Sequence, residues 1–163
     1  MRESRVETLI AKLEKGAQKT QQILSSLTVK EWQTVIYTHP HSWTVRDLLA
    51  HFVSAEEALL RMAQDVASGG PGSPQGFDLD GFNAAEQKRL ADRSPQYLLA
   101  ALTSTRRDTM EWVRTLTKEA LDRVGQHPAL GEISVETMVL AIYGHQLMHM
   151  RDLQGVLKPQ SRS

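Results

Sequence analysis

Two histidines at helical spacing have the clearest chemical potential in this chain. His145 and His149 lie four positions apart in an apolar segment near the end of the sequence. Residues at i and i+4 lie one turn apart on the same side of a helix, a spacing at which two imidazoles can bind one metal ion. The chain has no cysteine, so a metal ion would have nitrogen and oxygen ligands alone.

A third histidine, His51, lies in an earlier segment with the same apolar periodicity. At about 100° per residue, and with Met138 at zero, His145 lies near about −20° and His149 near about 20°. By the same count, His51 lies within about 40° of Ala55, an apolar position of its own helix. All three imidazoles are therefore predicted to face the interior.

The three histidines are also expected at one depth. His51 is seven residues after Thr44, a predicted helix cap, and His149 is seven residues before Val156, the last predicted core position. At a rise of about 1.5 Å per residue, each lies about 10 Å from its helix end. Antiparallel packing of these two helices would therefore bring the imidazoles together.

A metal ion competes with a simpler interpretation of these residues. Any one inward histidine is more often a core residue that hydrogen-bonds to a backbone carbonyl. Three neighbouring rings without partners would each cost about 1–3 kcal/mol, a large share of the stability of a domain. One shared divalent ion, Zn, Ni, Fe or Mn, would satisfy all three rings, so from the residues alone a metal site and a set of core histidines both stay open.

Four long segments with apolar residues at alternating spacings of three and four must position this site. The first covers residues 3–27, and the second follows the Thr44 cap and ends at the Gly/Pro-rich stretch 69–74. The third begins at Ser94-Pro95 and the fourth after Ser134. Strand patterns are almost absent, so we predict an all-α four-helix bundle.

The connections carry further signals. Thr28 and Glu31 have capping-box spacing, which predicts a short helical turn. Residues 80–92 predict a short extra helix between the second and third long helices, and residues 125–131 predict a loop. Glu56 and Glu57 project away from the apolar stripe and are interpreted as a solvated face. Residues 1–157 are treated as a single domain, and 158–163 as a polar tail.

Charge and composition limit the partners. Lys+Arg and Asp+Glu both number 19, so the formal net charge is +0. Nothing therefore drives the chain toward a phosphate backbone or an anionic membrane. The start of the chain has no signal-peptide pattern, and no run approaches a membrane-spanning length. We expect a cytoplasmic protein that binds neither nucleic acid nor membrane.

Two motifs give the chain a family resemblance. The run HSWTVRDLLAH at residues 41–51, with GHQLMH at residues 144–149, resembles the DinB/YfiT-like superfamily. The likeness covers about residues 4–157. It implies a four-helix bundle of up-down-down-up topology, with a long crossover between helices two and three. It also implies a metal held by one histidine on helix two and an H-x-x-x-H pair on helix four, which here are His51, His145 and His149.

The implied topology predicts which segments lie near the metal site and which lie far from it. The segment 35–43 and the approach to Ser94 are expected to form the mouth of the pocket, and the Gly/Pro-rich stretch is expected at the far end. His39 and His41 are interpreted as exposed loop residues. Trp43 is interpreted mainly as core packing, with a minority interpretation as a wall of the pocket.

Three imidazoles leave a coordination position open, which is typical of catalytic sites. Some relatives are implied to transfer or rearrange groups through low-molecular-weight thiols such as bacillithiol or mycothiol, and others are metal-dependent hydrolases. Asp152 is a weak candidate general base that could instead orient an imidazole, and its simpler interpretation is a partly exposed acid paired with a cation. The expected partner is a small-molecule substrate.

Two non-catalytic alternatives stay open. One is a module that captures a small molecule or a metal ion, and the other is a structural dimerising bundle with vestigial histidines. The resemblance also implies a homodimer, because relatives often pair bundle faces.

Overall fold

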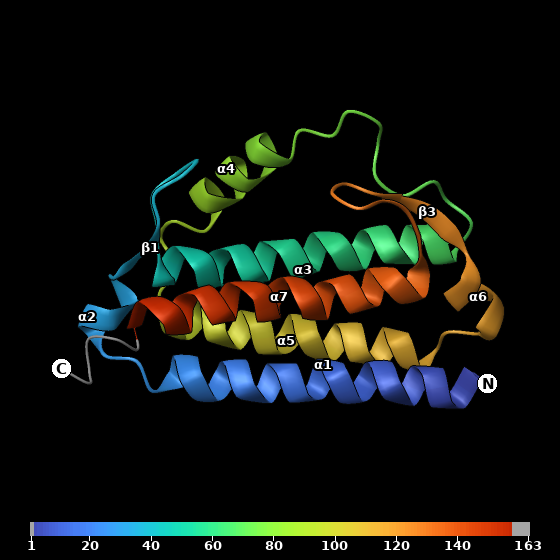
Figure 1. The fold of residues 1–163 in the computed structure, drawn as a ribbon, viewed down its shortest axis with the longest axis horizontal. Helices are drawn as coiled ribbons and strands as arrows, with labels where there is room; N and C mark the ends of the chain where they lie inside the picture. Colours follow the sequence, from blue (N-terminus) through green and yellow to red (C-terminus); the bar gives the residue numbers. More distant parts are fainter. Residues whose placement is uncertain (1, 158–163) are drawn as a thin grey trace.

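The computed structural model describes residues 2–157, so the tail predicted at 158–163 lies outside the described residues. Four long helices form the bundle, and three short helices and two small hairpins connect them (Figure 1). The helices are α1 (Arg2–Ser25), α2 (Val29–Trp32), α3 (Val45–Ala67), α4 (Leu79–Arg89), α5 (Pro95–Arg114), α6 (Lys118–Asp122) and α7 (Val135–Leu157). The strands are β1 (Val35–Tyr37), β2 (Trp43–Thr44), β3 (Val124–His127) and β4 (Gly131–Ser134).

The direction of the long helices confirms the predicted topology. In Figure 1, α3 and α5 run one way along the bundle, and α1 and α7 run the other. The crossover at residues 68–94, which contains α4, carries the chain back so that α5 can start beside the start of α3. The bundle is therefore up-down-down-up, with α3 and α7 packed as antiparallel neighbours.

Local capping explains where the helices begin. The Thr44 hydroxyl accepts a hydrogen bond from the Asp47 N–H, and the Asp47 carboxylate accepts one from the Thr44 N–H. Thr28 and Glu31 form the same capping box at α2. Ser94 caps α5, with proline at its first position. Each cap contributes about 1 kcal/mol and, more importantly here, sets the register of its helix.

The core consists of two apolar clusters along the bundle. One contains Leu9 and Leu13 of α1 together with Met138 and Ile142 of α7. The other is centred on the first half of α3 and includes Phe52. Within the described residues no helix combines the length and apolar character that crossing a membrane requires.

Two hairpins and α6 depart from the sequence-based expectation. The predicted loop at 125–131 is mostly a hairpin in which Val124 pairs with Ser134 and His127 pairs with Gly131. Gly131 has φ 78°, a left-handed conformation that glycine adopts without strain. The strands have two to four residues. Runs this short are below the length at which alternating hydrophobicity identifies a strand.

Glu56 is not part of a solvated face, which corrects the prediction for that residue. Its side chain is 2% exposed, and both carboxylate oxygens accept hydrogen bonds from the Arg106 guanidinium at 2.8 Å. Thr109 donates a further bond to this carboxylate at 2.9 Å, and Arg106 donates to the Leu13 carbonyl at 2.8 Å. The partners lie on α5 and α1, so a wheel of α3 alone could not reveal them. Glu57 is only half-buried.

Breaking this ion pair from one side should destabilise the bundle strongly. Glu56→Leu leaves the Arg106 charge buried without a counter-ion, and we expect the free energy of unfolding to fall by about 3–5 kcal/mol. Denaturant unfolding measures the change. The matched control Glu57→Leu removes a more exposed acid and should cost less than about 1 kcal/mol.

The double variant Glu56→Leu/Arg106→Met completes that experiment. It removes both charges and should recover most of the loss, because an apolar pair replaces a buried ion pair. A Glu56→Leu variant as stable as the Glu57→Leu control would contradict a buried, paired carboxylate.

Candidate metal centre

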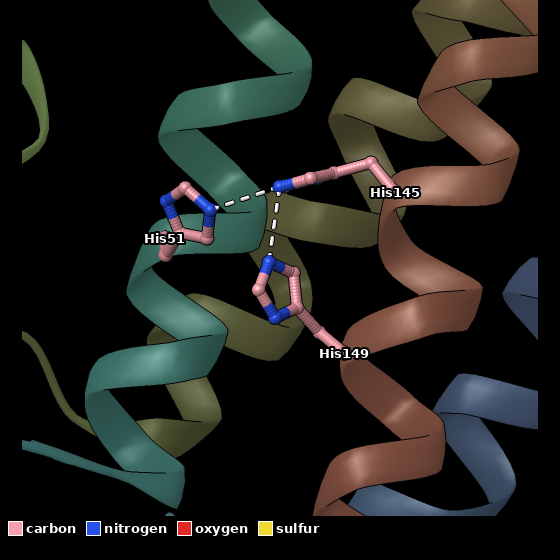
Figure 2. A group of neighbouring side chains, drawn as sticks. All are labelled: His51, His145 and His149. Carbon is pink, nitrogen blue, oxygen red and sulfur yellow. Dashed lines mark hydrogen bonds between the residues drawn. The ribbon is translucent and has the colours of Figure 1, made fainter. Parts of the chain in front are cut away.

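The three predicted histidines meet between α3 and α7. Figure 2 shows His51 extending from α3 toward His145 and His149 of α7, with one nitrogen of each ring at the centre of the group. The Nε2 atom of His145 lies 3.0 Å from Nε2 of His51 and 3.1 Å from Nε2 of His149. All three potential ligand nitrogens lie within 4.8 Å of one another. The structure therefore brings together the trio that the sequence singles out.

Burial keeps these imidazoles neutral. It lowers the pKa of His51 to about 3 and that of His145 to about 4, and repulsion from the neighbouring rings contributes to both shifts. Burial also lowers the pKa of His149, although the Asp152 carboxylate opposes this shift. A neutral imidazole has one nitrogen lone pair, which is the form that binds a metal ion.

Two of the three nitrogen separations are close to those of a shared ion, and the third lies within 4.8 Å. Metal–nitrogen bonds of about 2.0–2.1 Å in a tetrahedral site place the ligand nitrogens about 3.3 Å apart. The two contacts here, at 3.0 and 3.1 Å, are close to that spacing. Three nitrogen donors also suit Zn, Ni and Fe, the metals that imidazole commonly binds.

Tyr37 orients one of the rings. Its hydroxyl oxygen lies 2.8 Å from Nδ1 of His149, and its O–H donates to the Asp152 carboxylate. With its own proton committed to Asp152, the Tyr37 oxygen accepts the Nδ1–H of His149. Burial and the Asp152 charge hold the pKa of Tyr37 above its usual value, so the hydroxyl stays protonated. This arrangement leaves the Nε2 lone pair of His149 directed at the other two rings.

Asp152, the candidate base, lies beside the site through its hydrogen bond with Tyr37. Its carboxylate is exposed and accepts a hydrogen bond from Tyr37, whose oxygen also contacts His149. The sequence pattern did not indicate Tyr37 as a site residue, because it lies on a three-residue strand, 112 positions from its histidine partner. No local pattern connects the two.

Trp43 forms a wall beside the trio. Its ring centroid lies 4.8 Å from that of His51, and the indole is half-buried. Trp43 also lines both cavities that reach the histidines. The interpretation of this residue as a wall of the pocket agrees with this position.

A cavity of about 470 Å³ opens onto all three histidines. Its walls come from α3 and α7, from Trp43, from residues 72–83 of the crossover and from residues 127–129 at the tip of the β3–β4 hairpin. The Gly/Pro-rich stretch lies beside Val66, at the end of α3 far from His51, as expected, but its residues 72–74 also line the cavity. The reason is that the crossover and the hairpin both fold back over α3 and α7, as α4 and β3 do in Figure 1.

Backbone contacts hold these two walls together. The Ser73 N–H donates to the Gln126 carbonyl at 2.8 Å, and the Gln126 N–H donates to the Pro71 carbonyl at 2.9 Å. Gly72, between them, has φ 86°, and a Cβ there would lie 2.5 Å from the Gln126 carbonyl oxygen. Glycine is therefore required for the crossover to approach the hairpin this closely.

A smaller cavity of about 190 Å³ also reaches His149. Tyr37, His39, His41 and Trp43 line it, which agrees with a mouth built from residues 35–43, and both His39 and His41 are exposed as expected. Its opposite wall is Asp80 and Asn83 at the start of α4. The approach to Ser94 lines neither cavity, because α4 takes the position expected for it.

Solved structures with this fold include proteins of different described activities. YfiT from Bacillus subtilis, described as "a probable metal-dependent hydrolase with an unusual four-helix bundle topology", superposes with a TM-score of 0.72 at 21% identity, covering 93% of this chain and 87% of that one. The mycothiol-dependent maleylpyruvate isomerase gives a TM-score of 0.75 at 16% identity, covering 91% of this chain and 60% of the isomerase.

A third similar structure is the colibactin self-resistance protein ClbS in complex with a dsDNA. It gives a TM-score of 0.60 at 15% identity and covers 99% of this chain and 95% of that one. At these identities the three likenesses show a common fold. No protein of curated function is similar enough in sequence to be matched.

The family follows from the sequence itself. The sequence pattern of the DinB superfamily matches residues 12–153, a range that contains His51, His145 and His149. This match covers most of the chain and agrees with the topology of the bundle. The chain therefore belongs to the DinB superfamily.

Proposed function

We propose that this protein binds one divalent metal ion through the Nε2 atoms of His51, His145 and His149 and acts on a small molecule. The observation that carries the proposal is the convergence of three neutral imidazoles, with Nε2 atoms 3.0 and 3.1 Å apart, beside a cavity of about 470 Å³. Cavities of this size are typical of small-molecule sites. Three protein ligands leave room for a substrate atom or water on the ion.

The bound ion would supply Lewis acidity, which lowers the pKa of a coordinated water or thiol so that a nucleophile exists at neutral pH. The protein's own residues prepare this chemistry. Tyr37 and Asp152 hold His149 in one tautomer, and burial keeps His51 and His145 unprotonated. The cavity lining is largely apolar, which weakens solvent screening of electrostatic interactions beside the reacting groups.

A thiol-dependent transfer or isomerisation is a second candidate, alongside hydrolysis. Two cavities, of about 470 and 190 Å³, both include His149 and Trp43 in their walls. A hydrolase needs space for one organic substrate, whereas a thiol-dependent enzyme needs space for the substrate and the thiol together. The paired cavities support the second arrangement, with a low-molecular-weight thiol in one and the substrate in the other.

Binding of a small molecule is also preferred here over binding of DNA. The formal net charge is +0, and the centre lies in a largely apolar cavity instead of on a basic surface. A purely binding role for the site is the alternative that activity assays must exclude. The homodimer and the cytoplasmic location stay predictions.

Metal content tests the site directly. The purified protein should carry about one equivalent of Zn, Ni, Fe or Mn per chain by elemental analysis. His145→Ala should remove nearly all of it, because Nε2 of His145 is the atom shared by both close contacts. His39→Ala changes an exposed histidine of the smaller cavity and should leave the metal content intact. Equal metal in the two variants would contradict the site.

Tyr37→Phe tests the orientation of His149. The variant loses the oxygen that accepts the Nδ1–H, so the affinity for the metal should fall by about 10–100-fold. Competition with a chromogenic chelator measures the affinity. Tyr97→Phe is the matched control, because Tyr97 is exposed on α5 and its ring packs against Arg93. Wild-type affinity in Tyr37→Phe would mean that the tyrosine is only a packing residue.

A further inference from the structure

A fourth histidine lines the large cavity from outside the metal centre. His127 ends β3 at the tip of the hairpin, and its ring contributes to the same wall as the neighbouring Pro128 and Ala129. The sequence pattern predicted only a loop here. The histidine is not one of the three that form the metal-binding group.

Backbone hydrogen bonds determine which ring nitrogen of His127 carries the proton. The Ala129 N–H and the Leu130 N–H both donate to Nδ1 of His127, each at 3.1 Å. A nitrogen that accepts two such bonds has no proton of its own. The proton of the neutral ring is therefore on Nε2, which makes that atom a donor. Burial lowers the pKa of His127, which favours the same neutral form.

The donor at Nε2 lacks an acceptor. Nε2 of His127 is buried and has no hydrogen-bond partner within the part of the chain that the structure describes. Buried donors in folded proteins nearly always have a partner, and leaving one unpaired is unfavourable. A ligand oxygen that reached this position, once a neighbouring side chain moved aside, would remove that penalty, which favours binding.

The rest of the cavity wall restricts the chemistry of such a ligand. Most of the wall is apolar, and its larger members are Leu59, Met62, Phe77, Phe82 and Met148. Arg61 of α3 supplies a positive charge to this wall. Its side chain is exposed and makes no ion pair with any residue from Ser4 to Leu157. An apolar body with an anionic oxygen matches these two features together.

We propose that His127 is a substrate-binding residue whose Nε2–H donates to a carboxylate oxygen of a small, largely apolar carboxylic acid. The apolar part of this ligand fills the cavity of about 470 Å³, and its reactive group faces the three-histidine centre. Only this last point rests on the proposed metal-dependent function. The hydrogen bond to His127 depends on the hairpin and the cavity alone.

The test uses the full-length protein in chelator, so that no metal ion can bind the probe. The probe is 4-phenylbutyrate, with butylbenzene as the matched compound that lacks the carboxylate. Long-range ¹H–¹⁵N spectra of the histidine rings report the tautomer of His127 and its response to the probe. We expect the Nε2–H tautomer at pH 7 and a shift of its Nε2 signal as 4-phenylbutyrate binds.

The variant His127→Asn separates the two roles of the ring. The Asn side-chain oxygen can still accept from the Ala129 N–H and keep the turn, but its side chain is too short to replace Nε2. The affinity for 4-phenylbutyrate should fall by about 10-fold or more, as for loss of a hydrogen bond to a charged group. The affinity for butylbenzene should stay the same. His41→Asn, in the smaller cavity, should change neither.

Three results would overturn the proposal. They are an Nδ1–H tautomer of His127, failure of 4-phenylbutyrate to bind the wild type, and equal affinity in wild type and His127→Asn. The tautomer is read in the wild type, so it does not depend on how well the variant folds. A protein without metal would contradict the proposed function and leave these results unchanged.

Discussion

The placement of three neutral imidazoles between two antiparallel helices is the constraint on which the rest of this molecule depends. His51 from α3 and the His145–His149 pair from α7 meet only if both helices keep their rotation and depth to within a fraction of a turn. The long crossover makes α3 and α7 antiparallel, and the capping box at Thr44 sets where α3 begins. The topology of the bundle and the capping of α3 together determine where His51 meets the two histidines of α7.

The opposite side of α3 is held by a second polar contact. Glu56, five residues after His51, projects away from the site and forms a buried ion pair with Arg106, which also donates to a carbonyl of α1. A buried pair adds little net stability, but it has strict geometric requirements. We infer that it fixes the rotation of α3, and therefore the direction of His51. The stability of the bundle and the geometry of its site are in this way connected through one helix.

The His145–His149 pair, the four long helices and their caps could be predicted because each depends on residues close together in the sequence. The spacing of His145 and His149 and the Thr44–Asp47 box are examples of such local signals. His51, 94 positions from His145, was joined to the pair through its depth in the second long helix and the family resemblance. Tyr37, the buried state of Glu56 and the place of the crossover beside the cavity could not be predicted. Their partners lie 50 or more positions away, and only tertiary packing brings them together.

The central claim is that one metal ion lies between the three Nε2 atoms. The most direct test is an anomalous-difference map from a crystal of the protein as purified, recorded at the absorption edge of the metal that elemental analysis finds. We expect one dominant peak, about 2.0–2.2 Å from Nε2 of His51, His145 and His149. A metal peak elsewhere, or bonded to an Nδ1 atom of the trio, would contradict it.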